Sequence, residues 1–122
     1  MQYLLLLYQD EQQLKNMFAD GHKLWSEMHH VGTELLRASG RLLGGAQLQA
    51  ADPVATLSIQ HDQVMLTADP SAGVTGQLSA FYFIEAYDLN DAIQVAARLP
   101  QARYGSIEVR PVAGSASRAV GQ

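Results

Sequence analysis

Two short segments carry apolar side chains at consecutive positions. The first is Leu4–Leu7, flanked by Tyr3 and Tyr8, and the second is Phe81–Ile84. Runs of this length between polar residues are typical of buried strands rather than helices. Because successive side chains of a strand point to opposite faces, we expect both faces of the sheet to be apolar and buried at these positions.

The segment His22–Ser39 has the residue spacing of an amphipathic helix. Asp20 is a candidate N-cap, and Gly40 can end the helix in the left-handed conformation. The spacing predicts that the buried stripe consists of Leu24, Met28, Val31 and Leu35, with Trp25, Gly32 and Leu36 beside it. It places His29 at the border of this stripe, where packing can hold a side chain that still reaches solvent.

The other segments complete an order of strand, helix, strand, hairpin, strand, helix and strand. We predict a second helix at Leu89–Leu99, capped by Asp88 and ended by Pro100. Helical turns are expected over 10–18, a turn at Asp52-Pro53 and a bulge at Gly44-Gly45. Strands are expected at 3–8, 41–49, 55–60, 64–67, 78–86 and 106–110. This order is a split βαβ pattern with an inserted hairpin, which predicts a ferredoxin-like α+β fold.

The length of 122 residues suits one domain, assigned to residues 1–112, with 113–122 as a flexible tail. Two helices can cover only one face of the sheet, so the other apolar face needs a different cover. We expect a second copy of the chain to supply it through a twofold interface, which makes the protein a homodimer.

Composition excludes several classes of function. The net charge is −4, and the eight Lys and Arg residues form no basic stripe of the kind that binds nucleic acid. The absence of cysteine excludes thiolate catalysis, disulfides and cysteine zinc sites. Leu4–Leu7 is too short for a membrane span or a signal segment, so we expect a cytoplasmic protein without membrane partners.

The histidines do not form a metal-binding pattern. His29 and His30 are adjacent, and adjacent helical residues point about 100° apart. His22 and His29 lie seven residues apart on one face, but no third ligand accompanies them. Catalytic serine triads, phosphate-binding glycine loops and paired carboxylates are absent from the sequence pattern as well. We therefore expect neither a metal nor another cofactor.

Several segments resemble the YCII-related family, in particular its DGPF-type branch, over nearly all of residues 1–112. They are Tyr3–Tyr8, Leu35–Gly45, Leu48-Gln49, Asp88–Pro100 and Glu108–Pro111. The resemblance implies a dimeric ferredoxin-like fold of the dimeric α/β-barrel type and a poorly known biochemical role. It also implies an active-site pair of a helix histidine and a loop aspartate. The histidine is His29, eleven residues before Gly40, and the aspartate is Asp69. Ala68-Asp69-Pro70-Ser71 stands where the branch has Asp-Gly-Pro-Phe.

Two functions are compatible with these residues. His29 and Asp69 could form an acid–base or ligand-binding pair in a pocket between the first long helix and the sheet, with Asp69 orienting the imidazole and raising its pKa. The reaction would be a hydrolysis, a lyase reaction or an isomerisation. Alternatively, His29 makes a local hydrogen bond and Asp69 is a turn residue. The chain would then be a non-catalytic dimeric interaction module connected with sigma-factor regulation, because some relatives are encoded near or fused to sigma factors.

Overall fold

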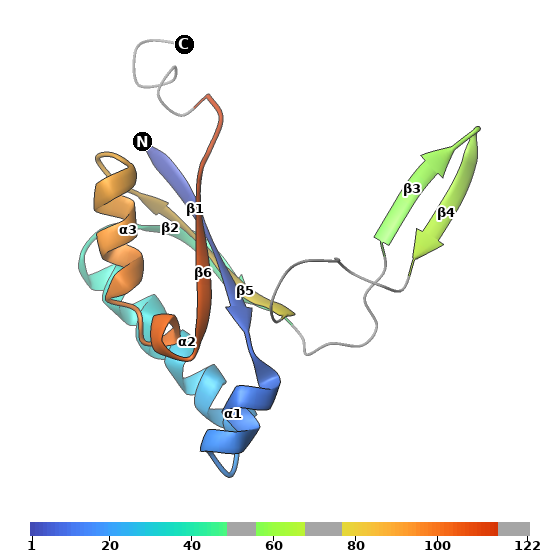
Figure 1. Cartoon of the computed structure of the whole chain (residues 1–122). Helices are drawn as coiled ribbons and strands as arrows, with labels where there is room; N and C mark the ends of the chain where they lie inside the picture. Colours follow the sequence, from blue (N-terminus) through green and yellow to red (C-terminus); the bar gives the residue numbers. More distant parts are fainter. Residues whose placement is uncertain (49–55, 68–76, 115–122) are drawn as a thin grey trace.

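The computed structural model describes residues 1–48, 56–67 and 77–114 (Figure 1). In chain order the elements are β1 (Gln2–Gln9), α1 (Glu11–Met17), α2 (Gly21–Ala38), β2 (Leu42–Gln47), β3 (Thr56–Gln60), β4 (Gln63–Thr67), β5 (Gln77–Glu85), α3 (Leu89–Ala97), the 3-10 helix η1 (Pro100–Arg103) and β6 (Gly105–Pro111). The predicted turn at Asp52-Pro53, the loop over 68–76 and the tail after residue 114 lie outside the described residues. None of the described helices has the length and apolarity needed to cross a bilayer.

A four-stranded antiparallel sheet forms the centre of the fold, with the strand order β2-β5-β1-β6. The helices lie on one side of this sheet (Figure 1). This arrangement confirms the ferredoxin-like α+β fold. The inserted hairpin is confirmed as well, and β3 and β4 form a separate two-stranded sheet.

Burial alternates along β1 because only one sheet face is covered by helices. Leu5 and Leu7 are fully buried against the helices, whereas Leu4 and Leu6 on the opposite face are only half-buried. The same alternation occurs in β5, where Tyr82 is buried and Phe81 is half-buried. Within the single chain the helices cover one face only, as predicted, and the face carrying Leu4, Leu6 and Phe81 is open. We call it the open sheet face. Burial of this second face by another copy of the chain stays a prediction.

Local capping fixes both ends of α2. The Asp20 side chain accepts a hydrogen bond from the Lys23 backbone N–H at 3.0 Å, which confirms it as the N-cap. At the other end Gly40 has φ 72°, and the N–H groups of Gly40 and Arg41 donate to the carbonyls of Arg37 and Leu36. This is a Schellman motif, which favours glycine because φ is positive.

The buried stripe of α2 differs from the prediction. Val31 and Leu35 are each 48 % exposed, while Trp25, Met28 and Leu36 are buried. The helix is rotated so that Trp25, Met28, Gly32 and Leu36 face the core, and half-buried His29 lies at the border of this face. The Trp25 ring lies close to Gly105 of β6, where an added Cβ would come within 3.2 Å of it, and Gly32 allows α2 to approach Tyr82 of β5.

The end of α3 also differs from the prediction. Asp88 caps the helix by accepting from the Asp91 N–H at 2.8 Å, as expected. The helix ends at Ala97, however, and Pro100 is the first residue of η1 rather than the stop of α3. Proline suits this position because the first N–H of a helix has no partner within it.

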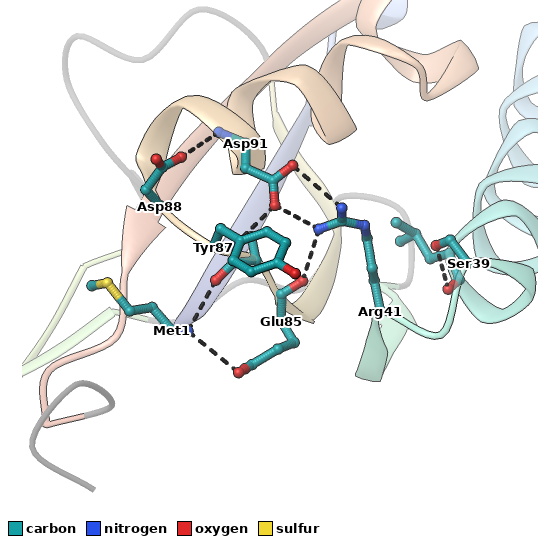
Figure 2. A network of polar contacts seen from close by, with 9 residues as sticks. Met1, Ser39, Arg41, Glu85, Tyr87, Asp88 and Asp91 are labelled. Carbon is teal, nitrogen blue, oxygen red and sulfur yellow. Dashed lines mark hydrogen bonds and ion pairs between the residues drawn. The ribbon is translucent and has the colours of Figure 1, made fainter. Parts of the chain in front are cut away.

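A polar network links the chain start to the starts of β2 and α3 (Figure 2). The Met1 ammonium group lies 3.3 Å from Glu85 Oε1. Arg41 forms a two-point ion pair with Asp91, with N–O distances of 2.7 and 3.3 Å, and also donates to the Glu85 carbonyl. Asp91 accepts a third hydrogen bond from the Tyr87 N–H at 2.9 Å. The network fixes α3 against the edge strand β2.

Bulges and turns occur where small or polar residues allow them. The register of β2 against β5 shifts between Leu42 and Gly44, which confirms the predicted bulge. A Cβ at Gly45 would lie 2.7 Å from the Phe81 carbonyl oxygen, so this strand pair requires glycine at that position. In the hairpin, His61 and Asp62 have φ values of 52° and 63°, as a tight type I′ turn requires.

Candidate functional site

His29 projects from α2 onto the central strand β5. Its imidazole ring stacks on the phenol ring of Tyr82, with centroids 5.0 Å apart and planes inclined by 6°. The side chain is half-buried, which agrees with the predicted border position. His29 is thus held by packing without being removed from solvent.

Tyr82 is itself fixed by hydrogen bonds on both sides of its hydroxyl group. The hydroxyl donates to the His29 backbone carbonyl at 2.8 Å and accepts from Gln101 Nε2 at 3.0 Å. A Cβ at Gly32 would lie 2.6 Å from the Tyr82 oxygen, so any larger residue would push the phenol away. Gly32 is therefore a precondition for the contact between α2 and Tyr82.

The surroundings of His29 favour the neutral imidazole. Partial burial lowers the pKa of His29 below its usual 6.5, and the neighbouring charge of His30 lowers it further. Burial raises the pKa of Tyr82, which keeps its hydroxyl protonated as a donor. At neutral pH the imidazole can accept a proton, which is the chemistry of a general base.

Three buried polar atoms near this contact have no hydrogen-bond partner among the described residues: His29 Nδ1, Trp25 Nε1 and Gln101 Oε1. Trp25 and His29 are four residues apart in α2 and therefore lie on the same helix face. The indole N–H can only donate and the amide oxygen can only accept, whereas a neutral imidazole nitrogen can do either. Buried polar atoms are normally hydrogen-bonded, so this set marks the layer between α2 and the sheet as the polar part of the core. We call His29, Tyr82, Trp25 and Gln101 the His29 cluster.

The second predicted site residue, Asp69, lies outside the described residues. Its contact with His29 therefore stays a prediction. No group of three or more His, Asp or Glu side chains in the described part of the chain could hold a metal ion. Three arginines that could otherwise bind an anionic ligand are each ion-paired with a carboxylate: Arg37 with Glu34, Arg41 with Asp91 and Arg110 with Glu108.

An apolar groove of about 240 Å³ lies elsewhere, between α3, η1 and β6. Ile93, Ala96, Ile107 and Val109 are among its lining residues. It contains no residue of the His29 cluster. This groove is therefore not the pocket predicted between α2 and the sheet, and that pocket stays a prediction.

Sequence reasoning missed Tyr82 and Gln101 as neighbours of His29. The sequence indicated only that Tyr82 is a core residue, since every residue of the segment Phe81–Ile84 is apolar or aromatic. Gln101 is fully buried in the 3-10 helix η1, which begins at Pro100. A glutamine after a proline is usually exposed, so the sequence did not indicate this burial. The one available signal was Gly32 within the apolar face of the helix, because an interior glycine often has a packing reason.

Comparison with known proteins identifies the family. No curated protein matches the chain. The model of the YCII-related domain matches residues 1–114 of the 122-residue chain. The chain therefore belongs to the YCII-related domain family.

Proposed function

We propose that the protein binds a small polar molecule at the His29 cluster and that His29 and Asp69 act there as a hydrogen-bonding or acid–base pair. The observation that carries this proposal is the stacked, half-buried His29. Its Nδ1 is buried with no hydrogen-bond partner among the described residues, and burial lowers its pKa. Stacking on Tyr82 sets the ring orientation that proton transfer requires.

Asp69 has the chemistry to complete the pair. A carboxylate next to one ring nitrogen would fix the tautomer and stabilise the imidazolium, which opposes the effect of burial. The other nitrogen would then exchange a proton with the bound molecule. The reaction class stays open among hydrolysis, lyase and isomerase chemistry.

We also propose a homodimer in which the open sheet faces of two copies pack together. Leu4, Leu6, Phe81 and Phe83 on this face are only half-buried in the single chain. Large contiguous apolar surfaces on soluble proteins usually mark an interface. Placement in the DGPF-type branch, with a divergent motif at Ala68–Ser71, rests on the order and spacing of the sequence motifs.

A thermal-shift screen tests the site. Wild-type protein, His29→Asn, Asp69→Asn and the control His30→Asn would be screened with small carboxylic acids, phosphate esters and amides. We expect compounds that raise the melting temperature of wild type and of the His30 variant, but not of the His29 and Asp69 variants. Equal shifts in all four proteins would contradict a site at His29.

The second candidate is a non-catalytic dimeric interaction module connected with transcription regulation. The observation that favours it is the number of exposed apolar residues outside the site, among them Leu57, Ile59 and Leu66 in the hairpin. Under this alternative, no compound would discriminate between wild type and the His29 variant, while the dimer would still form.

A further inference from the structure

The β3–β4 hairpin has one wholly apolar face. Directly opposed residues of an antiparallel pair lie on the same face, and the register pairs Leu57 with Leu66 and Ile59 with Val64. The opposite face contains Ser58, Gln60, Gln63 and Met65. We call the set Leu57, Ile59, Val64 and Leu66 the hairpin apolar face.

None of the residues that the structure describes covers this face. Its four side chains are 58–66 % exposed, and the hairpin stands apart from the four-stranded sheet (Figure 1). An isolated two-stranded hairpin is marginally stable in water, so a hairpin with an apolar face needs a surface to pack on. That surface must itself be apolar, because no charged side chain belongs to the hairpin apolar face.

The chain contains a matching surface at one end of the open sheet face. Leu48 directly follows β2 and is 38 % exposed, and Leu78 lies opposite Tyr8 at the start of β5 and is 41 % exposed. Gln47 bonds to Ser26 of α2 and so points to the helix side, which places Leu48 on the open side. Both leucines are more exposed than the half-buried centre of the open sheet face.

We propose that the hairpin is a dimerisation arm, whose apolar face packs on Leu48 and Leu78 of a second copy of this chain. The inference rests on the proposed homodimer and extends it. Among the described residues of one chain, neither the hairpin apolar face nor this end of the sheet is covered by the other. A second copy is therefore the partner that offers the complementary surface.

The buried area supports an exchange between two copies. A fully exposed Leu, Ile or Val side chain has about 60–120 Å² to bury, so the four side chains at their observed exposure contribute about 150–300 Å². With twofold symmetry each copy both gives an arm and receives one, which doubles the contribution of each subunit. A stable interface needs about 800 Å² per partner, and the two arms then supply a third or more of it. The central open sheet face supplies the rest.

Matched double variants on the same strand test the arm by sedimentation equilibrium. Leu57→Asp with Ile59→Asp places two charges on the hairpin apolar face, and Ser58→Asp with Gln60→Asp places the same charges on the opposite face. We expect the dimer dissociation constant to rise at least tenfold for the first variant and to change less than threefold for the second. Trp25 is buried in the helix–sheet core, so its fluorescence verifies that the core of each variant is folded.

Cross-linking distinguishes the arm from other contacts. Because the protein has no cysteine, the Leu66→Cys variant can be labelled at this one position with a photoreactive maleimide. A mixture of chains with light and heavy isotopes then distinguishes cross-links between two copies, which join a light and a heavy peptide, from cross-links within one chain. Cross-links between copies to peptides containing Leu48 or Leu78 support the proposal. Cross-links confined to one chain, or joining only the two hairpins, overturn it. A dimer that persists unchanged in the Leu57/Ile59 variant overturns the arm alone, whereas a monomeric wild type overturns the homodimer as well.

Discussion

Tyr82 contacts His29 through two different groups. Its ring stacks on the imidazole at 5.0 Å, and its hydroxyl donates to the backbone carbonyl of the same residue at 2.8 Å. The side chain and the main chain of His29 are therefore held by one residue of the central strand. A change at Tyr82 should separate these two effects.

We expect Tyr82→Phe to keep the stack but to lower the free energy of unfolding by about 1–3 kcal/mol, because Gln101 Nε2 loses its buried acceptor. Urea unfolding measures the loss, and Tyr87→Phe is the control, since Tyr87 is 87 % exposed. The control should stay within about 0.5 kcal/mol of wild type. Equal losses in both variants would show that the hydrogen bonds of Tyr82 contribute nothing specific.

The charge of His30 should be measurable at His29. His30 lowers the pKa of His29, so His30→Gln removes a neighbouring positive charge and should raise the pKa of His29. Titration of the imidazole resonances by NMR measures this, with the His29 peak assigned by its loss in His29→Gln. His61→Gln, in the hairpin turn, is the control. An unchanged or lower His29 pKa in His30→Gln contradicts the electrostatic account.

Neighbouring glycines of β2 should respond differently to alanine. In Gly45→Ala the new Cβ meets the Phe81 carbonyl oxygen at 2.7 Å, whereas in Gly44→Ala it meets nothing within 4 Å. We expect Gly45→Ala to lower the free energy of unfolding by about 1–3 kcal/mol, as overpacking does. Gly44→Ala should be neutral or slightly stabilising in denaturant unfolding. Comparable destabilisation by both would contradict the close approach of β2 to β5.

The Arg41–Asp91 ion pair predicts a pH dependence of stability. Hydrogen bonds from Arg41 and from the Tyr87 N–H lower the pKa of Asp91 below its usual 3.8. As the pH falls through 3.8, the unfolded chain takes up the proton first, so this contribution is complete above that pH and is lost below it. Arg41→Gln should flatten the decrease in unfolding free energy between about pH 5 and 2, and Arg37→Gln should not. An identical pH profile for wild type and Arg41→Gln would contradict this prediction.

The fold could be predicted from the sequence because the residues that begin and end its helices act through local contacts. Asp20, Asp88 and Gly40 cap helices through contacts within a few residues, and the alternating order of elements leaves few topologies. The rotation of α2 could not be predicted in the same way. Val31 and Leu35 fit an apolar stripe as well as Trp25 does, and only the sheet beneath the helix decides which row is buried.

The candidate site shows the same division. His29 could be placed at the border of the helix stripe from spacing alone. Its contact with Tyr82 depends on how α2 packs on β5. The burial of Gln101 depends on the 3-10 helix that begins at Pro100. Both are long-range packing outcomes that residue patterns do not encode.

The central claim is that Asp69 acts on His29, and the His29 pKa in wild type and in Asp69→Asn tests it most directly. If the carboxylate lies next to the imidazole, its removal should lower the pKa of His29 by about one unit or more, because the imidazolium loses its opposite charge. Asp62→Asn in the hairpin turn should leave the value unchanged. The same His29 pKa in wild type and in Asp69→Asn would contradict the pair.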